Sequence, residues 1–298
     1  IPDDVMTYGF LTDANVELGN YKEAEQAAQW MLDLRPGNVP ALTRVAYLRE
    51  LFGDIDGAID LMQAAYQRTP YAESEDRAWT LTQLAHLHLI TGRLEEADKL
   101  LQSALALYPD YHYALANLGT LRASQRRFDD SVKAFRDLYR VAPHPENLYL
   151  LATSLGTAGR PAEAGKAFVE FEQKALAESM TTDNSNRELI YYFVDVDGNP
   201  PEALRIARME MARRHDAPTL EAYAWALQAS GAMADARQAM DSALEVGIRD
   251  AAAFYRAGII AKRSGDATAA QAYFRKSIDT NPRSEFADPA RQELDSQL

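Results

Sequence analysis

A repeat of about 34 residues is the feature that most constrains how this chain can fold. Glycines that follow a helical apolar pattern recur at Gly19, Gly53, Gly92, Gly159, Gly198, Gly231 and Gly265. Successive glycines are 33 to 39 residues apart, except for one interval of 67 residues. That interval is about twice the others, and Arg126 stands where the missing glycine is expected. A fixed period of this length is typical of a chain built by stacking one small unit many times.

The residues around each glycine position also repeat. Five residues after it comes a small residue, in the order Ala24, Ala58, Ala97, Ser131, Ala164, Ala203, Ala236 and Ala270. Several units then close with a proline, namely Pro36, Pro70, Pro109, Pro143 and Pro282. A glycine suits a left-handed helix end, a small residue lets two helices approach closely, and a proline cannot continue a helix. Each unit is therefore expected to be a pair of helices.

The apolar spacing within the last unit supports this interpretation. Its first half places Phe254, Ala257, Gly258 and Ala261 at i, i+3, i+4 and i+7. Its second half places Ala270, Phe274, Ser277 and Ile278 at i, i+4, i+7 and i+8. Both are single-face helical stripes, as in amphipathic helices that share one core.

The pattern resembles the tetratricopeptide repeat family, and the resemblance covers nearly the whole chain. A good example runs from Trp79-Thr80-Leu81 through Gly92-Arg93-Leu94-Glu95-Glu96-Ala97 to Ala104 and Pro109. The resemblance implies an all-α, right-handed superhelical solenoid of about eight helix pairs, which should make about one turn. First helices would line its inner face, and the inner groove would hold an extended peptide or a helix of a partner protein.

The expected organisation is a single solenoid domain over residues 1–298. Its units are predicted at 5–38, 39–72, 78–111, 112–144, 145–178, 184–216, 217–250 and 251–284. Residues 285–298 should form a capping helix, because the open end of a solenoid must be covered to stay soluble. Residues 175–186 are polar and overlong, so the array is expected to bend there. Unit six also departs from the family pattern, with Arg187 where a core residue is expected.

Composition removes several classes of function. The chain has 31 basic and 44 acidic residues, a net charge of −13, so nucleic acid is not an expected partner. It has no cysteine, which excludes disulfides and thiolate chemistry, and no apolar run long enough for a direct membrane span. The Ile1 start fits either a mature exported protein or an excised fragment, and the absence of cysteine fits an exported or a cytoplasmic bacterial protein. The compartment is left open, with an exported bacterial protein favoured over a cytoplasmic one.

No catalytic or cofactor motif is present. The sequence lacks G-x-G-x-x-G, the phosphate-binding G-x-x-x-x-G-K, H-E-x-x-H and G-x-S-x-G. His86 and His88 are two residues apart on a helix, so their side chains diverge and cannot share a metal ion. The sequence therefore predicts no catalytic residues, no metal site, no cofactor and no enzyme activity.

The repeat register selects candidates for a partner-binding concave groove. The set is Tyr47, Trp79, His86, Tyr113, Asn117, Tyr149, Tyr192, Trp225 and Tyr255. Many are aromatic, and aromatic residues carry much of the energy of protein interfaces. The alternative is that 15 Tyr and 3 Trp spread over eight helix pairs place some rings on every face. Glu50, Glu188, Asp195 and Glu221 add negative charge to the same face.

Two functions are consistent with these features. The first is a non-catalytic scaffold or adaptor that binds a peptide or helix of a partner protein, with self-association also possible. The second, from family analogy, is an exported bacterial scaffold that contacts glycans or a polysaccharide-export complex. The groove positions Thr82, His86 and Asn117 do not build a cationic clamp, so an acidic carboxyl-terminal tail is not an expected ligand.

Overall fold

The structure is a computed structural model that describes residues 4–181, 184 and 186–296, and within these ranges it contains helices and no strands. The first eight helices are α1 (Val5–Glu17), α2 (Tyr21–Leu34), α3 (Val39–Leu51), α4 (Ile55–Arg68), α5 (Ser74–Ile90), α6 (Leu94–Leu107), α7 (His112–Ser124) and α8 (Phe128–Val141). The next nine are α9 (Pro145–Thr157), α10 (Pro161–Glu178), α11 (Arg187–Asp195), α12 (Pro200–Met211), α13 (Ala217–Ala229), α14 (Met233–Glu245), α15 (Ala251–Arg263), α16 (Ala267–Thr280) and α17 (Ala287–Asp295). Residues 182, 183 and 185 of the expected bend and residues 297 and 298 of the expected cap lie outside the described residues.

Local sequence signals fix where the helices begin. Asp54, Asp216, Asp250 and Asp266 each accept a hydrogen bond from a backbone N–H in the first turn of the following helix. These bonds satisfy donors that a helix start leaves without a partner. Proline occupies the first or second position of five helices, where its missing N–H does no harm.

The turn inside each helix pair uses a left-handed residue. Gly53 has φ +79°, and the N–H of Asp54 donates back to the carbonyl of Arg49 at 2.8 Å. This geometry ends one helix and starts the next within a few residues. Arg126 adopts the same conformation with φ +59°, and the N–H of Arg127 donates to the carbonyl of Arg122 at 2.8 Å. Unit four therefore keeps the turn although it has lost the glycine.

The core lies in the wall of the solenoid, between the first and second helices of each pair. All eight small residues of the repeat are buried there, and Ala97 and Ala270 are fully inaccessible. Two pairs approach so closely that a phenylalanine of the second helix lies over a glycine of the first. A Cβ on Gly119 would lie 2.5 Å from the Phe135 ring, and one on Gly258 would lie 2.5 Å from the Phe274 ring.

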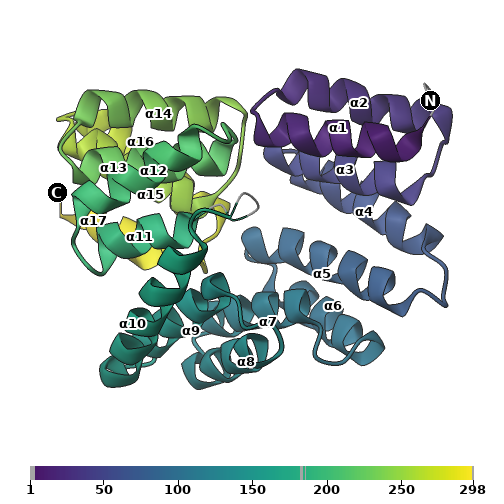
Figure 1. Cartoon of the computed structure of the whole chain (residues 1–298), viewed down its shortest axis with the longest axis horizontal. Coiled ribbons are helices and arrows are strands. Elements are labelled where there is room, and N and C mark those ends of the chain that lie inside the picture. The colour runs from purple at the N-terminus through teal and green to yellow at the C-terminus, as the bar shows by residue number, and fades with distance from the viewer. Residues whose placement is uncertain (1–3, 182–183, 185, 297–298) are drawn as a thin grey trace.

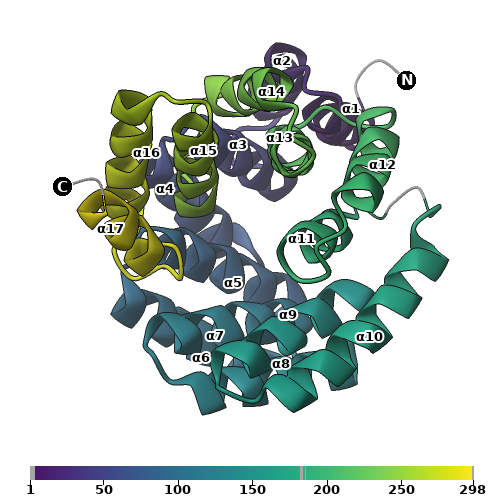
Figure 2. The ribbon, with the colours of Figure 1, turned by 90° about the vertical axis from the view of Figure 1, so that its left-hand side faces the viewer.

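The helix pairs wind into a superhelix around an enclosed interior. In the view along its axis, the first helices α5, α9, α11, α13 and α15 surround the interior, and the second helices lie outside them (Figure 2). In the perpendicular view, α11–α17 form a second turn that lies beside α1–α4 (Figure 1). The short helix α17 packs on α16 and covers the end of the array, with Ala287 and Ala290 buried.

Successive turns of the superhelix bond directly to one another, and we call this contact the seam. The carbonyl of Glu17 accepts a hydrogen bond from the N–H of His215 at 2.8 Å. The hydroxyl of Tyr21 accepts one from the N–H of Ala217, also at 2.8 Å. Farther along, the side-chain amide of Asn281 donates to the carbonyl of Leu89 at 3.0 Å. Each of these three bonds joins residues that are more than 190 positions apart.

The seam also has apolar and ionic parts. Val246 and Ile248 pack against the cluster that contains Leu48 and Leu51. The carbonyl oxygen of Gly247 lies so close to Gly53 that a Cβ there would be 2.5 Å from it. Arg126 forms an ion pair with Asp288.

The seam corrects the expected superhelical repeat. We expected about eight units per turn, yet the turn of the first unit, at Gly19, already meets His215 at the boundary of the sixth and seventh units. Each unit therefore rotates more about the superhelix axis than expected, and the second turn begins earlier.

Candidate partner-binding site

The inner surface brings together side chains from units that are not neighbours in sequence. Burial raises the pKa of Tyr149 on α9. The charges of Asp195 on α11 and Glu285 before α17 also raise it, and Arg256 on α15 opposes the shift. The charge of Asp250 at the start of α15 contributes to raising the pKa of His86 on α5. Because these elements belong to different parts of the superhelix, their electrostatic contact occurs across the interior. Charged groups of different units therefore influence one another across the interior.

A cavity of about 600 Å³ opens on the interior at the N-terminal end, and we call it the interior cavity. It is lined by Thr12, Asp13, Val16, Glu17, Thr43, Arg44, Ala46, Tyr47, Glu50, Met62, Trp79, Gln83, Leu87, Arg187, Arg214, Asp216 and Pro218. These residues come from α1, α3, α4 and α5 on one side and, on the other, from α11, the loop after α12 and the start of α13. The seam therefore completes the cavity, because both turns of the superhelix contribute to its wall.

The arginines of the cavity wall are held by the protein's own acceptors. Arg44 donates to both carboxylate oxygens of Asp13, at 2.9 and 2.7 Å, and to the carbonyl of Pro40 at 3.1 Å. Arg214 lies between the carboxylates of Glu210 and Glu17, each 3.6 Å away. The guanidinium groups of Arg44 and Arg214 are thus largely engaged before any ligand arrives. The third arginine of the wall, Arg187, lies near the charges of Glu188 and Asp216.

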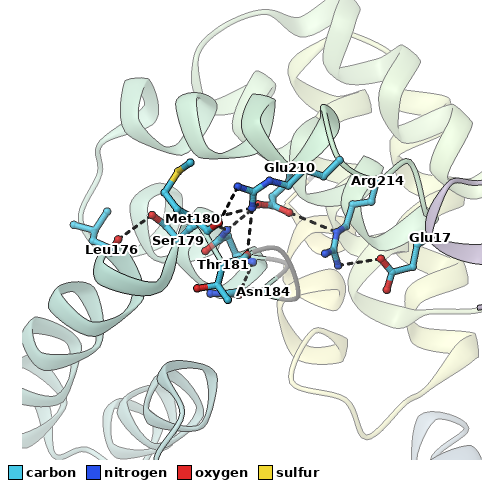
Figure 3. A network of polar contacts seen from close by, with 10 residues as sticks. Glu17, Leu176, Ser179, Met180, Thr181, Asn184, Glu210 and Arg214 are labelled. Atoms are coloured by element: carbon cyan, nitrogen blue, oxygen red, sulfur yellow. Dashed lines mark hydrogen bonds and ion pairs between the residues drawn. The ribbon is translucent and has the colours of Figure 1, made fainter. Parts of the chain in front are cut away.

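A buried network fixes Arg214 in this position (Figure 3). Glu210 is completely inaccessible, and its carboxylate accepts a hydrogen bond from the side-chain amide of Asn186 at 2.7 Å. The same amide donates to the carbonyl of Ser179 at 2.9 Å. Arg213 also contacts Glu210 and donates to the carbonyl of Met180 at 3.3 Å. The network anchors the segment after α10 to the end of α12 and, through Arg214, reaches Glu17 across the seam.

Glu50 sits in a different environment. Its carboxylate contacts Nε2 of His86 at 3.0 Å. Burial lowers the pKa of His86, but the bond to Glu50 and the charges of Glu50 and Asp250 outweigh it, so the pKa is raised overall. Burial raises the pKa of Tyr47 to about 12, with Glu50 and Asp216 acting in the same direction and Arg187 opposing them. The charge of Glu50 thus raises the pKa of His86 and adds to the effect of burial on Tyr47.

A second polar cluster lies further along the interior, around Arg256. Its guanidinium forms an ion pair with Glu221 and lies 4.1 Å from the centroid of the Tyr191 ring. Burial raises the pKa values of Glu221, Asp195 and Glu285, although Arg256 partly opposes each shift. One arginine is therefore surrounded by more carboxylates than it neutralises.

Models of known protein families match several parts of this chain. Three family models, each described as tetratricopeptide repeat, match residues 39–110, residues 82–143 and 116–178, and residues 251–284. Together they cover more than half of the chain. The chain belongs to the tetratricopeptide repeat family. Proteins of this family bind other proteins and are generally non-catalytic scaffolds.

Two solved structures are similar to this chain at low sequence identity. A tetratricopeptide repeat protein from Parabacteroides merdae ATCC 43184 is 20% identical with a TM-score of 0.48, over 86% of this chain and 97% of that one. The MamA protein is 19% identical with a TM-score of 0.43, over 61% of this chain and 97% of that one. The search of curated proteins found no match to this chain.

The tetratricopeptide register places some predicted residues at the interior cavity and others elsewhere. Tyr47 and Trp79 line the cavity, and Tyr47 is 44% exposed there. His86 lies beside it through its contact with Glu50, and Asn117 is a further hydrogen-bond neighbour of His86. Tyr113 is half-exposed in an aromatic group with Tyr108, Tyr111 and His112 at the start of α7, and it does not line the cavity.

Three predicted residues lie nearer the Arg256 cluster. Tyr149 contacts the rings of Phe168 and Phe171, and the charge of Arg256 opposes the rise in its pKa that burial causes. Tyr255 packs against Phe274 and Phe286. Trp225 is buried and donates its ring N–H to Asp195 at 2.9 Å. Trp225 is thus a structural part of the wall rather than a free ring.

Tyr192 requires a correction. It is 5% exposed, packs against Phe168 and Phe171 in the wall, and donates its hydroxyl hydrogen to Glu172 at 3.0 Å. Its neighbour Tyr191 faces the interior instead, beneath Arg256. The repeat register is displaced by one residue here, and one residue corresponds to about 100° around a helix. The same displacement turns Arg187 toward the interior cavity rather than the core.

Sequence reasoning also missed the C-terminal side of the cavity. Arg214, Asp216 and Pro218 lie at the end of unit six and the start of unit seven, outside the usual groove positions. Only the fold of the second turn over the first brings them there. In the described part of the chain, no group of three or more His, Asp or Glu side chains could hold a metal ion. No helix among those residues is long and apolar enough to span a membrane.

Proposed function

We propose that this tetratricopeptide repeat protein is a non-catalytic scaffold that binds a short segment of a partner protein in the interior cavity. The observation that carries the proposal is the half-exposed ring of Tyr47 in a cavity of about 600 Å³ built by both turns of the superhelix. That volume is within the range of specific binding sites, roughly 300–1,000 Å³. Aromatic side chains in such a cavity gain much of their binding energy by becoming fully covered.

The size of the cavity limits what it holds. A helix about 10 Å across rises about 1.5 Å per residue, so each residue fills roughly 120 Å³. A cavity of about 600 Å³ then accommodates about five residues. The bound element is therefore a short peptide segment or a single helical turn, and the rest of the partner lies outside.

The test is to identify the partner and then to probe the cavity. The tagged protein captures partners from its source organism, mass spectrometry identifies them, and the purified partner is titrated against the wild-type protein and variants. Tyr47→Ala should weaken binding by about tenfold or more, because it removes a ring from the cavity. Tyr71→Ala is the matched control, since Tyr71 is 89% exposed and does not line the cavity.

The result decides between this proposal and its alternatives. Equal affinities for the wild-type protein and Tyr47→Ala would rule out the cavity as the binding site. A glycan array probed with the same variants tests the second function, an exported scaffold that contacts glycans. Tyr47-dependent glycan binding without a protein partner would favour that function. Sedimentation of the purified protein tests self-association, which would appear as a concentration-dependent mass.

A further inference from the structure

The charges of the interior cavity indicate what kind of segment it accepts. Four carboxylates line the cavity, on Asp13, Glu17, Glu50 and Asp216. Asp13 is paired with Arg44, and Glu17 lies near Arg214. Asp216 caps α13 by accepting a hydrogen bond from the N–H of Thr219 at 2.7 Å. The ion pair of Glu50 is with His86, a group that can lose its charge near neutral pH.

Glu50 also has aromatic neighbours of the kind that attract a cationic side chain. Tyr47 lies one helical turn before it on α3, and Trp79 lines the same cavity from α5. The faces of tyrosine and tryptophan rings attract ammonium and guanidinium groups, and the attraction grows as water is removed. Tyr47 is 44% exposed, so its ring has area left to cover.

Buried carboxylates also lie beyond this cavity. The raised pKa of His86 arises from Glu50 and from Asp250 on the other side of the interior. Around Arg256, Asp195, Glu221 and Glu285 each have a raised pKa, with burial as the first cause. A positive charge entering the interior would relieve these buried carboxylates. A negative charge would gain less from the arginines of the cavity wall. Arg44 and Arg214 already have carboxylate partners, and Arg187 lies near the charges of Glu188 and Asp216.

We propose that the interior cavity recognises a basic segment of the partner protein, with a Lys or Arg side chain lying against Tyr47 and Trp79 and its charge beside Glu50. This inference rests on the proposed function and adds the chemistry of the partner. The net charge of the chain is −13, which attracts a basic segment toward the protein. The cavity then binds one basic side chain of that segment.

The experiment uses three fluorescein-labelled nonapeptides of Gly, Ser and Ala that carry three Lys, three Glu or no charged residue. Fluorescence anisotropy measures their binding to the full chain at 50 and at 500 mM NaCl. We expect the lysine peptide to bind at least tenfold more tightly than the glutamate peptide, and its affinity to fall at high salt. Glu50→Gln should weaken the lysine peptide by about tenfold, the usual effect of losing a charge-assisted hydrogen bond.

The control separates the cavity from the general acidity of the protein. Glu95→Gln removes the same charge from the exposed start of α6, and it should leave the affinity for the lysine peptide within about twofold. Equal effects of Glu50→Gln and Glu95→Gln, or no binding of the lysine peptide up to 1 mM, would overturn the inference.

The same peptides distinguish failure of the inference from failure of the proposed function. If the neutral or glutamate peptide binds best and Tyr47→Ala weakens it, the cavity binds peptides and only the basic chemistry is wrong. If no peptide and no captured partner responds to Tyr47→Ala, both proposals fail. Circular dichroism confirms that each variant keeps its helical content.

Discussion

Arg126 holds a backbone conformation that costs most side chains energy. Its φ of +59° is left-handed, and residues with a Cβ lose about 1–2 kcal/mol there relative to ordinary conformations. The hydrogen bonds of the turn are nevertheless complete, with the N–H of Arg126 donating to the carbonyl of Ala123 at 2.8 Å. The turn therefore keeps its geometry and carries local strain.

Arg126→Gly should stabilise the protein by about 0.5–1 kcal/mol. The change relieves the strain, and the greater freedom of glycine in the unfolded chain offsets part of the gain. The ion pair with Asp288 is lost, but both side chains are exposed and such pairs contribute little. Thermal unfolding followed by circular dichroism gives the midpoint. Arg127→Gly is the control, since Arg127 has φ −94° and should gain nothing. An unchanged or lower midpoint for Arg126→Gly would show that the turn is not strained.

His86 makes the stability of the fold depend on pH. Its pKa in the folded state is raised above 6.5 by Glu50 and Asp250, although burial acts in the opposite direction. The folded state therefore binds a proton more tightly than the unfolded state. The stabilisation from this group is complete below pH 6.5 and is lost as the pH rises through the raised folded value.

Urea unfolding between pH 5.5 and 8.5 tests this dependence. The stability of the wild-type protein relative to His86→Gln should be greatest at the acid end and should decrease with rising pH. The test uses the difference in unfolding free energy between the two proteins, because two other histidines also make stability depend on pH. Burial lowers the pKa values of His88 and His112, so their contributions to stability increase with rising pH. A difference that stays constant over this range would contradict the assignment to His86.

At the scale of single helices, close packing depends on particular glycines. Gly119 and Gly258 occupy equivalent places on α7 and α15, where Phe135 and Phe274 lie over them. Gly165 on α10 is exposed and has no neighbouring atom within 4 Å of a Cβ position. The same residue type thus has opposite roles within helices of one chain.

Gly258→Ala should destabilise the protein, while Gly165→Ala should stabilise it. An alanine at either place gains about 1 kcal/mol in helix propensity. At Gly258 the new methyl group would overlap the Phe274 ring, and overpacking of a core costs about 1–3 kcal/mol. Urea unfolding of the two variants measures both effects. A stabilised Gly258→Ala protein would mean that the two helices can separate without loss.

The helices themselves follow from the sequence, because their signals are local. Glycine spacing, Asp caps and the buried small residues all act within one unit, and each recurs. Unit six shows the limit of such reasoning. Its first helix, α11, has only nine residues and begins at Arg187. The repeat register could not show which of Tyr191 and Tyr192 faces inward, since one residue of displacement exchanges them.

At the scale of the whole molecule, the seam sets this solenoid apart from a simple stack. In most repeat arrays each unit contacts only its neighbours, so stability is a sum of local terms. Here Tyr21 bonds to Ala217 and Asn281 bonds to Leu89, between units in successive turns. The interior cavity depends on the same contact, since its wall combines α1, α3 and α5 with residues of α11 to α13.

The seam could not be predicted from the sequence. A small rotation between neighbouring units is set by side-chain packing and accumulates along the array. A modest error per unit therefore moves the later units far from their true position, and with them Arg214 and Asp216. The repeat register could select Tyr47 and Trp79, which line the cavity, but it could not select the residues that the second turn supplies.

Gly53→Ala tests whether the seam holds the superhelix closed. Gly53 has φ +79°, and a methyl group there would lie 2.5 Å from the carbonyl oxygen of Gly247 in the next turn. Gly231→Ala is the matched control, because Gly231 has φ +81° and nothing within 4 Å of its Cβ position. Both variants suffer the left-handed strain of about 1–2 kcal/mol, but only Gly53→Ala forces the turns apart.

Small-angle scattering should show a larger radius of gyration for Gly53→Ala alone, and the same variant should lose more stability in urea. Since the interior cavity needs both turns, binding of the partner should weaken in Gly53→Ala and persist in Gly231→Ala. Identical scattering from the two variants would mean that the turns can slide past the new methyl group and that the seam does not determine the shape.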